Sequence, residues 1–273
     1  MCLTNELSED YFDYRNEVNF NDSTLISNFS YMRFLDNFLR NKSIEICETQ
    51  DRECFDLNNH QNLKRRLNLV HELFDNSYLK SNFFNRLIRR EIVFSQTEKQ
   101  LDETLDIINK FDLQSIDKKE LSQLITIQNK YLINSNLKQM SLRSPSMDTT
   151  QLGKVSKGKP IVMNTWSALS FKSKLKNLDK INELAQKYPE ISFISLNLDF
   201  QNPAIWQNAL KRINISKQDE FQVVSDMPSN TYGFFKNYLN RVYLIDKDYN
   251  ITNNSLSLYD PKLESQILEV LNR

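Results

Sequence analysis

The side chains that could do covalent or metal chemistry are few and lie early in the chain. The sequence has three cysteines and two histidines, all before residue 72. Their spacings match none of the C-x2-C or H-x3-H pairs that hold a zinc ion. On one helix, His60 and His71 would lie roughly 16 Å apart at about 1.5 Å of rise per residue, too far to share an ion. We therefore expect no metal site.

The oxidation state of the cysteines has two possible interpretations. Cys47 and Cys54 are separated by six residues, across what we interpret as the first turn between helices. They form a disulfide if the protein folds in an oxidising compartment, or they remain two reduced, partly buried thiols. Cys2 is either a terminal thiol or a lipid-attachment residue exposed when an upstream signal is removed.

Glycine is scarce, which excludes the common nucleotide-binding loops. The chain has only three glycines, Gly153, Gly158 and Gly233, and they do not cluster. Phosphate loops and dinucleotide turns need clustered glycines, because a Cβ would block the approach of the backbone to phosphate. We expect no nucleotide and no other cofactor.

The overall charge favours neither nucleic acid nor membrane. Lys+Arg and Asp+Glu number 35 each, and 40% of the residues are hydrophobic, as expected of a globular chain. No stretch reaches the roughly 20 apolar residues of a membrane span, and the first residues lack the pattern of a signal peptide. The short basic groups are interrupted by acids and are interpreted as solvated helix faces; they are Lys64–Arg66, Arg86 with Arg89 and Arg90, and Lys172 with Lys174 and Lys176.

The first half of the sequence has helical periodicity. Between residues 23 and 134, apolar side chains recur at i, i+3, i+4 and i+7, and glycine and proline are absent before residue 145. The clearest stripe consists of Tyr31, Phe34, Leu35, Phe38 and Leu39. We predict four or five packed helices in an all-α domain spanning residues 1–140.

After a loop-rich linker at 135–160, which has room for a short strand or hairpin, strands alternate with helices. The predicted strands are 161–166, 191–198, 221–224, 242–246 and 251–255. The predicted helices are 170–187, 203–213, 230–238 and 261–271. This order predicts a second domain, residues 141–273, with a mixed sheet covered by helices on both faces.

The segment Gly158–Ser173, GKPIVMNTWSALSFKS, resembles the pattern G-K-x-V-x-V-N-F-W-A-x-W-C-x-P-C of the TlpA/ResA-type thiol-disulfide oxidoreductases of bacteria. The predicted strands at 191–199 and 242–246 continue the resemblance, which covers about residues 150–273. The helical half is similar to the helical regions that precede this domain in longer TlpA-family proteins. The resemblance implies an α/β thioredoxin-like C-terminal domain and a periplasmic or cell-envelope setting, although we recognise no signal peptide in the chain.

This sequence departs from the family at its redox site. Ser170 and Ser173 occupy the positions of the two cysteines, and a serine hydroxyl neither forms a disulfide nor ionises at neutral pH. Asn240 occupies the position of the cis-proline, and Tyr249 stands in a turn where glycine is usual. Ser170 as a hydrolytic nucleophile would need a neighbouring base, and both histidines lie in the other half. We therefore interpret Ser170 as a helix N-cap and Ser173 as a first-turn residue.

These departures predict a redox-inactive thioredoxin-like protein with no catalytic residue, which binds another protein or an extended peptide. In the family, the corresponding face near the helix start receives extended peptide. Leu169, Phe171 and Leu239 are the candidates for that binding face, and Trp166 belongs either to it or to the core. Whether the protein is an enzyme stays open. The alternative is a TlpA-like thiol-disulfide oxidoreductase that acts through cysteines outside the usual motif, either Cys47 and Cys54 or the cysteines of a partner.

Overall fold

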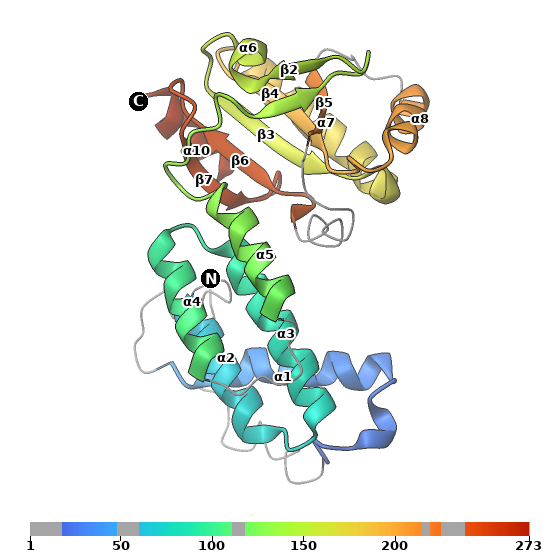
Figure 1. Ribbon diagram of the computed structural model, residues 1–273, viewed down its shortest axis with the longest axis vertical. Coiled ribbons are helices and arrows are strands. Elements are labelled where there is room, and N and C mark those ends of the chain that lie inside the picture. Colours follow the sequence, from blue (N-terminus) through green and yellow to red (C-terminus); the bar gives the residue numbers. More distant parts are fainter. Residues whose placement is uncertain (1–17, 48–59, 111–117, 214–218, 225–237, 273) are drawn as a thin grey trace. The chain divides into compact units, whose positions relative to one another are not determined.

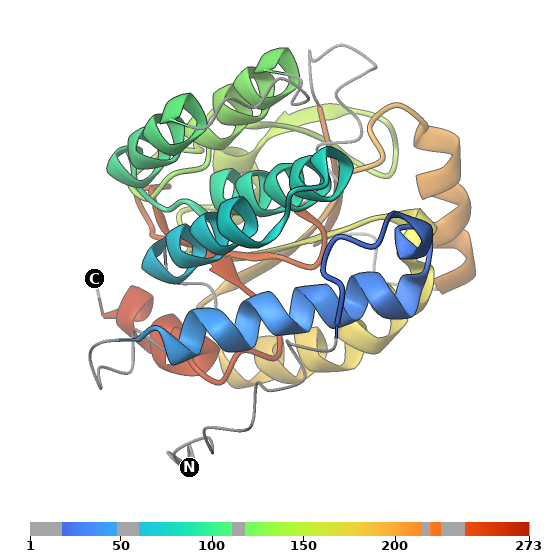
Figure 2. The ribbon, with the colours of Figure 1, turned by 90° about the horizontal axis from the view of Figure 1, so that it is seen from below.

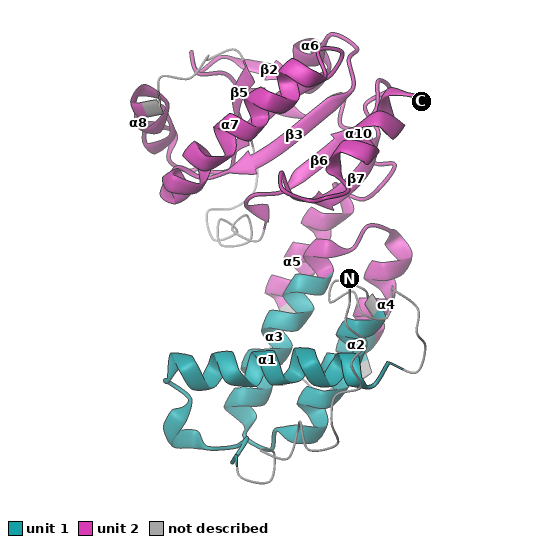
Figure 3. Ribbon diagram, turned by 180° about the vertical axis from the view of Figure 1, so that it is seen from behind, with its two compact units in different colours: residues 1–91, 107–116 teal, residues 92–106, 117–273 magenta. Residues whose placement is uncertain are grey.

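The computed structural model describes residues 18–47, 60–110, 118–213, 219–224 and 238–272 (Figure 1). The chain divides into two compact units (Figure 3). Unit 1 comprises Met1–Glu91 and Ile107–Ile116, and unit 2 comprises Ile92–Asp106 and Asp117–Arg273. Neither unit begins or ends at residue 140 or 141. The boundary between domains at that place therefore stays a prediction.

Unit 1 is helical. It contains the short 3-10 helix η2 (Ser23–Leu25), α1 (Phe29–Glu45), α2 (His60–Leu73) and most of α3 (Ser77–Phe94). Asn28 begins α1 by accepting the backbone N–H groups of Ser30 and Tyr31. Four residues of the stripe on α1 are buried as its periodicity predicts, with Leu35 and Phe38 at its centre, and Phe34 is partly exposed. Before residue 130 the described α-helices number five, counting α4 (Glu98–Lys110), most of which belongs to unit 2, and α5 (Lys118–Asn129), which belongs to unit 2 entirely.

Unit 2 is built on a seven-stranded mixed sheet with the strand order β2-β1-β5-β4-β3-β6-β7. The strands are β1 (Ser141–Arg143), β2 (Thr149–Gln151), β3 (Ile161–Trp166), β4 (Ser192–Asn197), β5 (Glu220–Val223), β6 (Val242–Ile245) and β7 (Ile251–Leu256). Strands β3, β4 and β5 are parallel, while β6 is antiparallel to β3 and β7 is antiparallel to β6. The linker contributes the hairpin β1–β2, which extends the sheet beyond β5.

The helices of unit 2 follow the predicted alternation. They are α6 (Leu152–Ser156), η4 (Ala168–Ser170), α7 (Phe171–Lys187), α8 (Pro203–Ile213) and α10 (Leu263–Leu271). The order β3-α7-β4-α8-β5, followed by the antiparallel pair β6–β7 and α10, is that of a thioredoxin-like sheet, so the predicted fold class is confirmed. The helix predicted over 230–238 lies outside the described residues except for Tyr238.

The two faces of the central strands meet different parts of the unit, because alternate residues of a strand point to opposite faces. Val162 packs with Leu184 of α7 and Ile267 of α10 in one core cluster, and Figure 2 shows these two helices on the same side of the sheet. On the other face, Met163 and Thr165 lie near Tyr131, which follows α5. Burying each such aliphatic side chain contributes about 1.5–3 kcal/mol relative to leaving it exposed.

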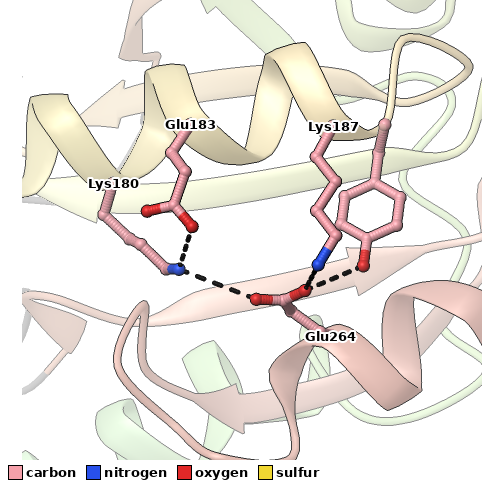
Figure 4. A network of polar contacts seen from close by, with 5 residues as sticks. Lys180, Glu183, Lys187 and Glu264 are labelled. Atoms are coloured by element: carbon pink, nitrogen blue, oxygen red, sulfur yellow. Dashed lines mark hydrogen bonds and ion pairs between the residues drawn. The ribbon is translucent and has the colours of Figure 1, made fainter.

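A surface network joins α7 to α10 (Figure 4). The carboxylate of Glu264 receives hydrogen bonds from Lys187 and from the hydroxyl of Tyr188, and Lys180 lies 3.6 Å away. These hydrogen bonds lower the pKa of Glu264, the one from Lys187 most of all. The side chains of Lys187 and Glu264 are partly exposed, so their ion pair contributes little to stability, whereas Tyr188 is buried.

The turn between β6 and β7 holds a tyrosine in an unusual conformation. Tyr249 has φ +71°, in the left-handed region, although its side chain is large. The ring is buried, and its hydroxyl donates a hydrogen bond to the carbonyl of Gly153 at 3.0 Å. A Cβ on Gly153 would lie 2.9 Å from the side chain of Lys138 and 3.7 Å from the Tyr249 ring, so the glycine is required by close packing.

Within the described residues, no helix has the length and apolarity needed to cross a membrane. The same part of the chain contains no cluster of three or more His, Cys, Asp or Glu side chains able to hold a metal ion.

Candidate functional site

The loop from β3 to α7, residues 167–170, is fixed by a buried carboxylate. Ser167 donates its hydroxyl to Oδ1 of Asp199 at 2.6 Å, and the N–H of Ala168 donates to Oδ2 at 2.6 Å. The same Ser167 oxygen accepts the N–H of Leu169 at 3.1 Å, which caps η4. Ser167 and Asp199 are both buried, so the loop that opens α7 is held from the end of the neighbouring strand.

Asp199 is itself held by amide side chains from β4 and β5. Asn197 donates Nδ2 to Oδ2 of Asp199 at 2.9 Å and accepts the Asp199 N–H at the same distance. Gln222 donates to Asn197 and to the carbonyl of Asp199, and Arg143 of β1 donates to Gln222 at 2.9 Å. A chain of hydrogen bonds therefore runs across the sheet from β1 to the start of α7. No sequence motif singles out these residues, because they come from four separate segments of the chain.

The two serines lie at the start of α7. Ser170 occupies the N-cap position, with φ −107° and ψ 40°, but its hydroxyl makes no capping hydrogen bond. Its N–H donates to the carbonyl of Ser167 at 2.9 Å. Ser173 lies in the first turn, and both serines are partly exposed. The hydroxyl that caps in this segment is thus that of Ser167, three residues before Ser170.

The turn that carries Asn240 is bonded to β3. Asn240 has φ +58°, a left-handed conformation that asparagine tolerates better than most residues, and its N–H donates to the carbonyl of Thr165 at 3.0 Å. Thr165 in turn donates its hydroxyl to the carbonyl of Tyr238. No peptide bond between described residues is cis.

The candidate binding face is unevenly exposed. Leu169 is 66% exposed, whereas Leu239 and Phe171 are partly buried. Phe171 packs against the core cluster formed by Trp166 and Trp206, and Trp166 is only 2% exposed, so Trp166 belongs to the core. The helix α8, which η4 contacts, carries a further exposed apolar residue near its start, Ile205, which the sequence pattern does not single out.

Lys174, directly after Ser173, forms a buried ion pair with Glu220 at 2.5 Å. The lysine also lies over the ring of Trp166, 4.8 Å from its centroid. Burial lowers the pKa of Lys174 and raises that of Glu220, and the charge of each partner opposes the shift of the other. The interpretation of every basic group as a solvated face is therefore wrong for Lys174, and also for Arg66, which is 2% exposed.

The cysteines lie away from this site in the sequence. Cys47 is disulfide-bonded, and its sulfur accepts a hydrogen bond from Arg65 at 3.4 Å. Cys2 and Cys54 lie outside the described residues, so the pairing of Cys47 with Cys54 stays a prediction. His71 is exposed on α2.

The strand order, the helix that follows β3 and the turn before β6 together define a thioredoxin-like region from β1 to α10. No family model and no curated protein matches the sequence. Similar solved structures cover the C-terminal half. One is a protein of Bacteroides vulgatus assigned as a thiol-disulfide oxidoreductase, with 24% identity and a TM-score of 0.40 over 49% of this chain and 86% of that chain.

Two further similar structures are the thioredoxin domain of a thiol-disulfide oxidoreductase from Bacteroides vulgatus and a SCO1/SenC family lipoprotein from Bacillus anthracis. The first has 15% identity and a TM-score of 0.38 over 50% of this chain and 97% of that one. The second has 14% identity and a TM-score of 0.39 over 51% of this chain and 95% of that one.

Proposed function

We propose that the thioredoxin-like region is a redox-inactive module that binds a protein or an extended peptide at the start of α7. The observation that carries the proposal is the exposure of Leu169. This apolar side chain is 66% exposed, directly before Ser170, in a loop whose backbone is fixed by Asp199. A rigid loop that presents an apolar side chain loses little conformational entropy on binding.

The chemistry of the two serines supports a binding role over a redox role. Cysteines at the start of a helix are activated because the helix dipole and free N–H groups stabilise a thiolate. A serine at the same place is not activated in this way, because its hydroxyl stays protonated at neutral pH. The turn at Asn240 is hydrogen-bonded to β3, and the loop before α7 is hydrogen-bonded to Asp199. On this proposal, the start of α7 offers an ordered binding surface without a reactive thiol.

The proposal is tested with the reduced and carboxymethylated B chain of insulin, an extended apolar peptide without free thiols. Fluorescence anisotropy would compare the full chain with Leu169→Asp and with a matched control, Leu268→Asp, which changes a leucine 49% exposed on α10. Loss of one buried leucine contact predicts an affinity about tenfold lower for Leu169→Asp only. Equal affinity of all three proteins, or no binding by the unaltered chain, would contradict the proposal.

Phe171 is a poorer choice for this experiment. Its ring packs against the cluster of Trp166 and Trp206, so Phe171→Asp is expected to disturb the core as well as the surface. A loss of binding by that variant would not separate a contact from a fold defect.

The alternative function, thiol-disulfide exchange through Cys47 and Cys54, is favoured by one observation. The guanidinium of Arg65 donates to the sulfur of Cys47, and a positive charge there would stabilise a Cys47 thiolate on reduction. Reduction of insulin by dithiothreitol, followed by turbidity, separates the two functions. The binding module predicts no acceleration by the protein, whereas turnover that disappears in Cys47→Ser would establish the alternative.

A further inference from the structure

Arg241 carries a positive charge into the interior of unit 2, directly after Asn240. The residue is 3% exposed. Its Nη1 donates to the carbonyl of Val93 at 2.6 Å and to the carbonyl of Asn254 at 3.3 Å. A buried guanidinium is costly unless its charge is offset and its N–H groups are hydrogen-bonded. The position of Arg241 therefore needs a physical reason.

The C-terminal end of α3 offsets this charge. Val93 is the second-last residue of α3, so its carbonyl is among those without an N–H partner inside the helix. That end also carries the partial negative charge of the helix dipole. The guanidinium lies over the rings of Phe94 and Tyr238, 4.2 and 5.1 Å from their centroids, where cation–π attraction adds to the stabilisation.

The backbone of Arg241 is bonded to β3 next to the candidate site. Its N–H donates to Oγ1 of Thr165 at 3.0 Å, and the N–H of Thr165 donates to the carbonyl of Arg241 at 2.9 Å. Asn240 donates its own N–H to the carbonyl of Thr165. One residue thus connects the end of α3, through its side chain, to the turn at residues 238–241, through its backbone.

We propose that Arg241 is a positioning residue for the binding face: it uses the end of α3 as an anchor to hold the turn that carries Leu239 and Asn240 against Thr165. The inference rests on the proposed function. Thr165 precedes the loop that presents Leu169 by only a few residues, so the anchor fixes the turn and the loop relative to one strand. The helical residues 92–94 then take part in shaping the site.

A nearby residue offers a control, because its side chain is hydrogen-bonded to the segment that follows α3 and not to the turn. Asn254 is buried and donates Nδ2 to the carbonyls of Ser95, at 3.2 Å, and Tyr131, at 2.7 Å. Asn254→Leu removes these hydrogen bonds and is expected to destabilise unit 2 by an amount comparable to Arg241→Met. It leaves the side chain of Arg241 and the hydrogen bonds of Thr165 in place.

The test compares the full chain with Arg241→Met, Arg241→Lys and Asn254→Leu. Hydrogen exchange under native conditions would follow the amides of Thr165, Asn240 and Arg241, and anisotropy would follow the carboxymethylated insulin B chain. We expect Arg241→Met to raise exchange at these amides at least tenfold and to weaken binding about tenfold. Arg241→Lys, which can still reach one carbonyl, should restore part of both, and Asn254→Leu should bind like the unaltered chain.

Unchanged exchange at the turn in Arg241→Met, or equal weakening by Asn254→Leu, would overturn the inference, since the role of Arg241 would then be general stability. Unchanged binding by Arg241→Met with a loosened turn would overturn it as well. Failure of the unaltered chain to bind the peptide is a different result. It would contradict the proposed function, and the exchange measurement would still decide whether Arg241 holds the turn.

Discussion

The ammonium group of Lys174 lies 2.5 Å from Oε1 of Glu220, and both side chains are buried. Lys174 belongs to the first turn of α7, and Glu220 opens β5 in register with Ser195, which is in register with Asn164 of β3. The pair joins the start of α7 to β5, which is an outer strand of the three parallel strands β5-β4-β3. In the interior, neither charge is acceptable without the other.

Removing one partner of this pair should therefore cost far more than removing both. Lys174→Met leaves the Glu220 carboxylate buried and unpaired, and we expect it to lower the free energy of unfolding by about 3–5 kcal/mol. The double variant Lys174→Met with Glu220→Leu replaces both charges by apolar side chains of similar size and should lie close to the unaltered chain. Urea unfolding at pH 7 measures both. A double variant as unstable as the single one would show that the charges are not coupled in this way.

The carboxylate of Asp199 should be essential to the loop that presents Leu169. Asp199→Asn keeps the size of the side chain but replaces one accepting oxygen by an N–H donor, so either Ser167 or Ala168 loses its acceptor. We expect a loss of about 1–3 kcal/mol in unfolding free energy, together with faster amide exchange at Ala168. Asp260→Asn is the control, because its exposed carboxylate accepts from the N–H of Lys262. Equal effects of the two substitutions would contradict this role.

The network at Glu264 should give a small dependence of stability on pH. The folded protein lowers the pKa of Glu264 below its unfolded value of about 4.3. Its stabilisation is therefore fully present above that value and is lost as the pH falls through the folded pKa. We expect Glu264→Gln to be slightly less stable than the unaltered chain at pH 7 and equal to it at low pH.

The same substitution has a second pH limit and a salt dependence. The pKa of Lys187 is raised by its hydrogen bond to Glu264, so the contribution of the lysine is present below about 10.4 and disappears as the pH rises through its folded pKa. High salt should reduce the difference, because the groups are exposed and the Debye length falls to about 3 Å at 1 M. Unfolding curves that differ equally at every pH and salt concentration would refute the electrostatic explanation.

The start of α7 should still be able to activate a thiol. In Ser170→Cys, the introduced thiol occupies the N-cap position of a 17-residue helix, where we expect its pKa to fall below the ordinary value of about 8.5. The pH profile of alkylation by iodoacetamide, read at that residue by mass spectrometry, measures the pKa. Asp179→Cys, exposed in the middle of the same helix, is the control. Coincident profiles for the two cysteines would contradict the expectation.

Many helices and strands could be predicted because their positions follow from patterns of residues that are close together in the sequence. The strand predicted at 161–166 is β3 itself, since a short, mostly apolar run lies between Pro160 and Ser167. Helix α7 ends at the predicted residue, Lys187, and begins one residue after the predicted start. The bounds of β1 and β2 could not be predicted, because three-residue strands carry little periodicity.

The polar architecture of the site could not be predicted, because its partners are far apart in the sequence. The hydroxyl of Ser167 and Asp199 are separated by 32 positions, Lys174 and Glu220 by 46, and Arg241 and Val93 by 148. Nothing in the pattern around Lys174 distinguishes it from its exposed neighbours Lys172 and Lys176. Only the register of three strands reveals which charged side chain is buried.

The turn at Tyr249 has an evolutionary consequence. A left-handed conformation costs a residue with a side chain roughly 1–2 kcal/mol, a cost that glycine does not bear. Here the ring of Tyr249 is buried and its hydroxyl is bonded to Gly153, which in turn has no space for a Cβ beside Lys138. The ring of Tyr249 would lie 3.7 Å from such a Cβ, which is an ordinary contact, so loss of the tyrosine would leave the obstruction by Lys138 in place. We expect the glycine to persist even in lineages that lose the tyrosine.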